Sequence, residues 1–134
     1  MRKVQQHKLD AKRPKEVAWT EFEAINWYRN VLFPAANKRG LHPALCGSVM
    51  YRGWGKDLDL CMMSMDDRAV TIQDIMGLAQ DLGVACEALG CSKYKGGRVI
   101  LKMMLDDGRT VDVLCCPGTS TGNLESLLTT KEQS

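Results

Sequence analysis

Two aspartates stand directly before an apolar run, in the stretch Lys56-Asp57-Leu58-Asp59-Leu60-Cys61-Met62-Met63. On a β-strand the side chains of Asp57 and Asp59 point to the same side, with their α-carbons roughly 6.6 Å apart at a rise of about 3.3 Å per residue. Carboxylates beside a buried strand need a neutralising partner, which can be a lysine, water or a metal ion. Two carboxylates at this spacing can converge on one divalent ion or straddle two ions.

A third acid, Asp112, lies in the apolar stretch Thr110-Val111-Asp112-Val113-Leu114. Strand alternation places Val111 and Val113 on one face and Asp112 on the other. An unpaired acid in such a strand is costly, and three acids that converge raise one another's pKa because like charges repel. Mg²⁺ suits them, because it prefers oxygen ligands and is usually shared between carboxylates and substrate phosphates. We therefore expect Asp57, Asp59 and Asp112 to hold Mg²⁺, with Mn²⁺ as a substitute.

A small anion-binding segment precedes the acidic pair. Gly47 allows the backbone to approach a ligand closely. Ser48, at the start of a short helical turn, offers a hydroxyl and backbone N–H groups to an anion. Arg52 and Lys56 are near enough in the sequence to add positive charge. The sequence therefore predicts a phosphate-binding segment shortly before a metal-binding pair of acids.

These segments together resemble the polymerase-beta-like nucleotidyltransferase superfamily. The pattern of that superfamily is an apolar residue, Gly-Gly or Gly-Ser, a spacer of variable length, an acid-apolar-acid triplet, and a third acid on a following strand. The matching segments are Leu45-Cys46-Gly47-Ser48, Asp57-Leu58-Asp59-Leu60 and Val111-Asp112-Val113, and Arg52-Gly53 resembles the Arg-Gly often found in the spacer. Residues 89 to 112 also resemble family-X polymerases in a Lys-aromatic loop and a hairpin. The resemblance covers roughly residues 41 to 116.

The resemblance implies a minimal, single-domain nucleotidyltransferase fold. It also implies Mg²⁺-dependent transfer of a nucleoside monophosphate from a nucleoside triphosphate to an acceptor hydroxyl, with release of pyrophosphate. Asp57, Asp59 and Asp112 would be the catalytic, metal-holding residues, and Asp112 would also orient or deprotonate the acceptor. Such phosphoryl transfer depends mostly on positioning and charge neutralisation. The residues expected to bind the nucleotide are Gly47, Ser48, Arg52 and Lys56.

Two features depart from the family pattern. Lys56 stands where a serine usually precedes the first acid, and it could contact phosphate or pair with an acid and weaken metal binding. The larger members carry helical domains that grip the acceptor or the base, and we expect none here. The acceptor, which is a nucleic acid 3′ end, a small molecule or a protein, would then be bound by the basic arm, the first helix or a partner chain.

Three alternatives remain open at this stage. The fold could serve a catalytically inactive binding or regulatory module, for example an antitoxin-like partner. The basic N-terminal arm could instead make the chain a nucleic-acid-binding accessory protein, because its lysines and arginines would contact phosphates. Asp57 and Asp59 could also be an ordinary exposed turn paired with Lys56.

Periodicity and turn signals predict the elements that would position these residues. The predicted elements are a helix from Pro14 or Lys15 to about Leu32, broken or kinked at Pro34 and finally stopped at Asn37-Lys38-Arg39-Gly40; an edge strand over 41–46; a helical turn over 49–52; a strand over 57–65; a helix over 71–82 capped by Thr71 and Gly83; and strands over 98–105 and 110–116 joined in a hairpin by Asp106-Asp107-Gly108-Arg109. Residues 84 to 89 are ambiguous between strand and helix. In the first helix, Ala18, Phe22, Ile25 and Leu32 form the expected buried stripe. This order predicts an α/β or α+β domain, with helices packed on a small mixed sheet.

The length and composition agree with one domain. A chain of 134 residues with a net charge of +2 suits a single core, predicted over 15–116 between a basic flexible arm (1–14) and a partly disordered tail (117–134). No apolar stretch approaches the ~20 residues needed to cross a bilayer, so no membrane partner is expected. Without the apolar segment of a signal peptide, a cytoplasmic location is expected. The six cysteines are interpreted as free, mostly buried thiols, with a zinc or redox role as the alternative.

Overall fold

The computed structural model of the chain describes residues 18–90 and 99–118. Several predicted segments lie outside the described residues. They are the basic arm, the start of the first helix, the Lys-aromatic loop from residue 91 and most of the tail. None of the helices in the described part of the chain is both long and apolar enough to span a bilayer.

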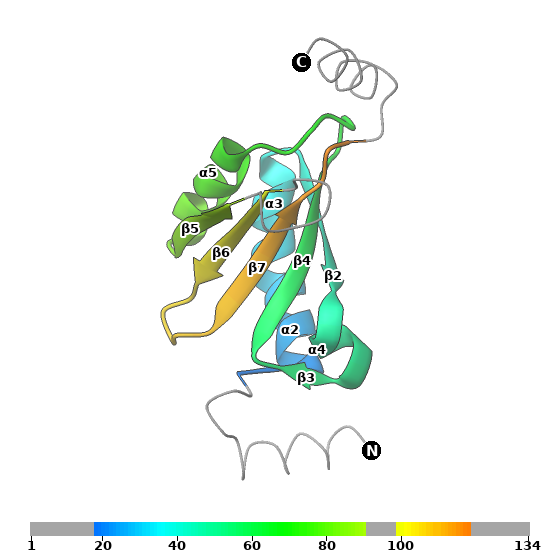
Figure 1. The fold of residues 1–134 in the computed structure, drawn as a ribbon, viewed down its shortest axis with the longest axis vertical. Coiled ribbons are helices and arrows are strands. Elements are labelled where there is room, and N and C mark those ends of the chain that lie inside the picture. The colour runs from blue at the N-terminus through cyan, green and yellow to red at the C-terminus, as the bar shows by residue number, and fades with distance from the viewer. Residues whose placement is uncertain (1–17, 91–98, 119–134) are drawn as a thin grey trace.

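The described residues form a mixed sheet with helices, which confirms the predicted α+β class (Figure 1). The elements are β1 (Trp19–Thr20), α2 (Glu21–Trp27), the π-helical turn η1 (Tyr28–Leu32), α3 (Phe33–Lys38), β2 (Leu41–Cys46), α4 (Gly47–Arg52), β3 (Trp54–Gly55), β4 (Asp57–Ser64), α5 (Ile72–Leu82), β5 (Ala85–Gly90), β6 (Ile100–Met104) and β7 (Thr110–Cys115). The main sheet has the strand order β2-β4-β7-β6-β5, and β1 pairs with β3 in a second, two-stranded sheet. Within the main sheet β4 and β7 run parallel, and the other neighbouring strands are antiparallel.

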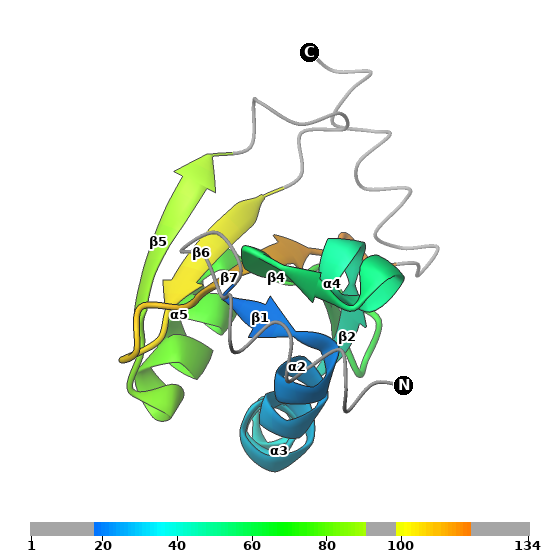
Figure 2. The same ribbon diagram turned by 90° about the horizontal axis from the view of Figure 1, so that it is seen from below.

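Helices cover one face of the main sheet. Figure 2 shows α2, α3 and α5 together on the same side of the strands. The strand side chains that face these helices are fully or almost fully buried: Leu58, Leu60, Met62, Leu101, Met103, Val111 and Val113. The alternate positions of the same strands point to the opposite side, which we call the open face, and they include Asp57, Asp59, Lys102, Thr110 and Asp112. The core therefore lies between the sheet and the helices, and the acids lie outside it.

Residues 18–20, which were predicted to be helical, are not part of the first helix. Trp19–Thr20 is β1, and α2 starts at Glu21. A capping box explains this start, because the Thr20 hydroxyl accepts a hydrogen bond from the backbone N–H of Glu23 while the Glu23 carboxylate accepts from the backbone N–H of Thr20. In this helix the predicted buried stripe is wrong at Phe22, whose exposed fraction is 63%.

Pro34 does not break the helix, and the final stop predicted at Asn37-Lys38-Arg39-Gly40 is confirmed, because α3 ends at Lys38. A proline inside an α-helix lacks an N–H donor, and its ring clashes with the carbonyl four residues earlier. Here the π-helical turn η1 precedes it, and the backbone N–H of Phe33 donates to the carbonyl of Tyr28, five residues back. Because this wider turn displaces the hydrogen-bond ladder where Pro34 enters, α3 continues to Lys38.

The side chain of Trp19 connects the small β1–β3 sheet to the main sheet. Its side chain is fully buried, and its indole Nε1–H donates to the carbonyl of Thr110 at 2.8 Å. In β1 the same residue pairs with Gly55 of β3. The guanidinium of Arg109 lies 4.1 Å from the centre of the Trp19 ring. These contacts fix the chain between α4 and β4 against the start of β7.

The later elements follow the sequence signals closely. Thr71 caps α5, and Gly83 ends it with a left-handed φ of 70°. The hairpin predicted around Asp106-Asp107-Gly108-Arg109 joins β6 and β7, and the backbone N–H of Leu105 donates to the carbonyl of Arg109 at 2.8 Å. The ambiguous residues 84–89 fall almost entirely in β5, an edge strand paired with β6.

The capping contacts of Asp74 give α5 a pH-dependent contribution to stability. The Asp74 carboxylate accepts hydrogen bonds from the backbone N–H of Thr71 and from the guanidinium of Arg68, each at 2.8 Å. The hydrogen bond from Arg68 is the main cause that lowers the pKa of Asp74 below its ordinary value of 3.8. A lowered carboxyl pKa stabilises the folded state above the pKa of the unfolded chain, and this contribution is lost as the pH falls below that value.

We expect Asp74→Asn to lower the melting temperature at pH 7 by about 5 °C, because a lost helix cap costs about 1 kcal/mol. The difference from wild type should hold down to about pH 5 and shrink below about pH 4, because the unfolded wild-type chain there binds a proton that the folded carboxylate, with its lowered pKa, still excludes. Circular-dichroism melts across this range measure it, with the exposed turn variant Asp106→Asn as the control. A difference that does not change with pH would contradict the expectation.

Candidate functional site

The three predicted acids lie together on the open face. Asp57 and Asp59 occupy alternate positions of β4, and Asp112 lies on the neighbouring parallel strand β7. The strand register makes Asp59 and Asp112 direct cross-strand partners, while Asp57 lies opposite Thr110. Neighbouring strands are about 4.8 Å apart, so the carboxylates of one row can approach a common point. The structure thus brings all three residues to one side of two adjacent strands.

Asp57 is held by a hydroxyl and an ammonium group. The Thr110 hydroxyl donates to Asp57 Oδ1. The Nζ of Lys102, on β6, lies 3.4 Å from the same oxygen. Both contacts come from strands on the β7 side of β4, so the Asp57 carboxylate is drawn toward Asp112.

Asp112 shares the same lysine. Its Oδ1 lies 3.2 Å from the Nζ of Lys102, the cross-strand partner of Asp112 on β6. This oxygen is shielded from solvent, and the ion pair is not aligned as a hydrogen bond. Burial lowers the pKa of Lys102, but the contacts with Asp112 and Asp57 outweigh it and raise that pKa overall. A single ammonium group is therefore shared by two of the three acids and offsets only part of their negative charge.

Asp59 is the acid whose charge is compensated least. Burial, followed by the charges of Asp112 and Asp57, raises the pKa of Asp59 above its ordinary value. Lys102 and a hydrogen bond from the backbone N–H of Ser48 oppose this rise. A carboxylate with a raised pKa among like charges gains from any additional cation.

Gly47 lies directly against Asp59. Its φ is +78°, in the left-handed region that favours glycine. A β-carbon added at Gly47 would lie 2.1 Å from Asp59 Oδ2, far inside contact distance. Position 47 therefore requires glycine for two separate reasons, and the glycine allows the start of α4 to touch an acid of the site.

The helix α4 begins earlier than predicted, at Gly47 instead of Val49. A second glycine permits its close packing, because a β-carbon at Gly55 would lie 2.8 Å from Val49 Cγ2 and 3.1 Å from Ser48 Oγ. The small β1–β3 sheet thus packs against α4. Ser48 lies between Asp59, to which its backbone N–H donates, and Gly55 of β3.

Neither of the two predicted basic nucleotide contacts forms an ion pair with the acids in the described part of the chain. The Arg52 guanidinium lies 3.9 Å from the centre of the Trp54 ring, and its Nε donates to the Trp54 carbonyl at 3.1 Å. Both Arg52 and Lys56 have exposed side chains. The lysine that pairs with the acids is Lys102, which the sequence reasoning did not single out.

The acids are not arranged as a ready-made metal site. Among the described residues, no three histidine, cysteine, aspartate or glutamate side chains are positioned together around one point that could hold a metal ion. The Lys102 ammonium lies between Asp57 and Asp112 instead. The residues still fit a divalent cation chemically, because three carboxylates on one face supply oxygen ligands and Asp112 Oδ1 lacks a hydrogen bond.

Two cysteines adjoin the acids. Cys46, the cross-strand partner of Asp59, has its Sγ 3.6 Å from the Sγ of Cys61. Burial, and next the contact with Cys61, raises the pKa of Cys46 to about 12, so this thiol stays protonated. Cysteines 46, 61, 86, 115 and 116 are all free thiols, of which Cys115 is buried and the others are half-buried. Cys91 lies outside the described residues.

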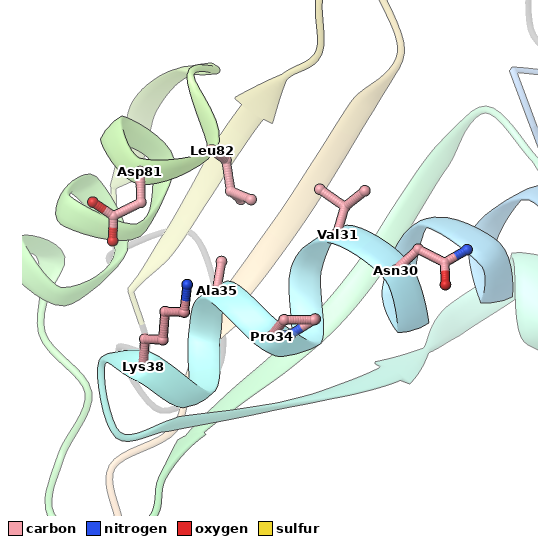
Figure 3. Close-up of a pocket in the computed structure, with 7 residues that line it drawn as sticks. All are labelled: Asn30, Val31, Pro34, Ala35, Lys38, Asp81 and Leu82. Atoms are coloured by element: carbon pink, nitrogen blue, oxygen red, sulfur yellow. The ribbon is translucent and has the colours of Figure 1, made fainter.

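A hollow of about 570 Å³ lies between α3 and α5, away from the acids (Figure 3). Val31, Pro34 and Ala35 line it on one side, and Asp81 and Leu82 line it on the other. It belongs to the helical layer, on the face of the sheet opposite the acids. It therefore contributes nothing to the candidate site.

Neither a scan against protein-family models nor a search of curated proteins finds a match to this chain. The function must therefore be inferred from the geometry of the site.

Proposed function

We propose that this chain is a Mg²⁺-dependent nucleotidyltransferase that transfers a nucleoside monophosphate from a nucleoside triphosphate to an acceptor hydroxyl and releases pyrophosphate. The observation that supports it most is the meeting of Asp57, Asp59 and Asp112 on one sheet face. Gly47 and Ser48 adjoin this cluster at the start of α4. The order and the element types match the resemblance found in the sequence.

In this proposal the three carboxylates hold Mg²⁺, which when bound neutralises phosphate charge and aligns the reacting oxygens. Gly47 gives the triphosphate access to the backbone at the start of α4, and the Ser48 hydroxyl offers it a hydrogen bond. Asp112, on the central strand β7, is placed to orient or accept a proton from the acceptor hydroxyl. Arg52 and Lys56 are both exposed and would add positive charge for the phosphates.

The acceptor is not fixed by these residues. The open face carries half-buried side chains beside the acids, and a nucleic acid 3′ end, a small molecule or a protein would each present a hydroxyl to Asp112. The basic arm predicted to contact nucleic acid lies outside the described residues. A partner chain is a further source of acceptor contacts.

A regulatory module with the same fold is the second candidate, and Lys102 favours it. Its ammonium already lies within 3.4 Å of Asp57 and Asp112, where a divalent cation would be expected to bind. If this lysine stayed there permanently, it would occupy the position between Asp57 and Asp112 and keep a metal ion out. The protein would then bind nucleotide or a protein partner without turnover.

The test is to incubate the full chain with each labelled nucleoside triphosphate, with Mg²⁺ or with excess EDTA, and to measure pyrophosphate release and nucleotide binding. We expect pyrophosphate release in Mg²⁺ and none in EDTA, because the carboxylates alone repel a triphosphate. Nucleotide binding without release would favour the regulatory module. Absence of both, with salt-sensitive nucleic-acid binding that is lost on deleting residues 1–15, would favour the accessory protein.

A further inference from the structure

Lys102 is the group of the site that the proposed reaction does not use. It projects from β6 onto the open face, directly across from Asp112. Its side chain is 26% exposed, close to the 29% of Asp57 and 27% of Asp112, so these ion pairs lie at the boundary of solvent. An ammonium there stabilises the metal-free protein, because otherwise three carboxylates would face one another without a cation.

We propose that Lys102 is a displaceable internal counter-ion: it pairs with Asp57 and Asp112 in the metal-free protein and withdraws toward Glu87 when a divalent cation binds. This inference rests on the proposed function, since it concerns the same acids. It makes Lys102 a positioning residue that sets the metal affinity of the site.

The ammonium and a divalent cation cannot share the position between the carboxylates. A cation coordinated by Asp57 and Asp112 would lie close to Nζ, where two positive charges at the boundary of solvent repel each other more strongly than in bulk water. Coordination also takes the oxygens that Lys102 now contacts, at 3.4 and 3.2 Å. Metal binding therefore requires the lysine side chain to move.

Glu87 offers the lysine a second partner. In the antiparallel pair β5–β6, Glu87 is the direct cross-strand partner of Lys102, so both side chains project from the open face. Glu87 is exposed, and within residues 18–90 and 99–118 no ion pair engages it. A hollow of about 170 Å³ lined by Ala85, Cys86, Glu87, Lys102 and Met104 gives the side chain room to turn.

The row across the sheet thus reads Asp59, Asp112, Lys102, Glu87, with the lysine between acids on both sides. A lysine has a flexible four-carbon stem, so it can exchange one neighbour for the other without moving the backbone. In this arrangement the free energy of metal binding is weakened by the cost of breaking the ion pairs of Lys102 with Asp57 and Asp112. A new ion pair between Lys102 and Glu87 would offset part of that cost.

The experiment measures Mn²⁺ affinity by calorimetry and melting temperature in EDTA, using the full chain. Lys102→Met, which keeps the length but removes the charge, should bind Mn²⁺ at least about fivefold more tightly, because no ion pair has to be broken. The same variant should melt about 5 °C lower in EDTA and lose this deficit in saturating Mn²⁺. Lys38→Met, an exposed lysine on α3, is the matched control and should change neither value.

Two further variants keep the inference testable if Lys102→Met does not fold. Lys102→Arg should weaken Mn²⁺ binding, because a guanidinium grips two carboxylates more firmly than an ammonium does. Glu87→Gln should also weaken it, because the displaced lysine loses its second partner. A purely structural lysine would not shift metal affinity in opposite directions for Met and Arg.

The outcomes separate this inference from the proposed function. If wild type binds Mn²⁺ and the Met, Arg and Gln variants bind it equally well, the displacement of Lys102 is wrong and the metal site stands. If neither wild type nor any folded variant binds Mn²⁺, the proposed function is wrong, and this inference is overturned with it.

Discussion

Asp57→Asn is expected to reduce pyrophosphate release by at least about 10³-fold, because a carboxylate that holds a catalytic cation contributes several kcal/mol to stabilising the transition state. The asparagine side chain would keep the size of the aspartate and could still accept the hydrogen bond from Thr110, but it would lack the negative charge. The measurement is steady-state pyrophosphate release in saturating Mg²⁺, with nucleotide binding followed in parallel.

The matched control for this variant is Asp106→Asn, which removes the same charge from the exposed turn between β6 and β7. It should retain wild-type turnover. Melting curves establish that both variants are folded, since Asp57 also pairs with Lys102. Turnover of Asp57→Asn within tenfold of wild type would contradict the role of this acid and with it the proposed reaction.

The face of the strand on which each acid lies could be predicted from the sequence because short-range signals determine it, whereas the meeting of the acids also requires β4 to pair with β7. Asp-Asp-Gly-Arg places the turn of the hairpin, and counting outward from that turn fixes which residues of β6 and β7 face each other. Alternation then assigns Asp112 to the face opposite Val111 and Val113, both of which are buried. The same reasoning on residues 57–60 placed the other two acids.

The pairing of Lys102 with Asp112 could also have been predicted by counting residues outward from the hairpin turn. The hairpin register pairs Met104 with Thr110 and Lys102 with Asp112, and both pairs follow from the turn residues. A lone lysine between Leu101 and Met103 is the signal, because such a strand position faces away from the core. What the sequence could not supply is the contact with Asp57, because it depends on β4 lying parallel beside β7.

Other parts of the fold depend on contacts that short-range patterns do not contain. The helix continues past Pro34 because of the π-helical turn before it, and no residue type signals that turn. Trp19–Thr20 is too short for an alternation pattern, and it becomes a strand only because β3 lies beside it. Residues 84–89 form a strand through pairing with β6, which is distant in sequence.

Gly47→Ala is expected to reduce turnover strongly and to destabilise the protein more than the same change at any glycine where an added β-carbon meets no atom. An alanine at φ +78° costs about 1–2 kcal/mol by itself. The added β-carbon would also lie 2.1 Å from Asp59 Oδ2 and 2.8 Å from Asp59 Cβ, so either α4 or the acid must move. Because both belong to the candidate site, we expect at least about a 10²-fold loss of turnover.

Gly40→Ala separates the backbone cost of a positive φ from the cost of the contact with Asp59. Gly40 has a φ of +71°, but no atom lies within 4 Å of an added β-carbon. It should show only the backbone cost and keep full turnover. Asp59→Gly removes the side chain that an alanine at position 47 would strike. In that background the extra unfolding free energy lost by Gly47→Ala over Gly40→Ala should disappear, as denaturant titrations would show. Equal stability and turnover of the two alanine variants in the wild-type background would mean that the contact between Gly47 and Asp59 does not shape the site.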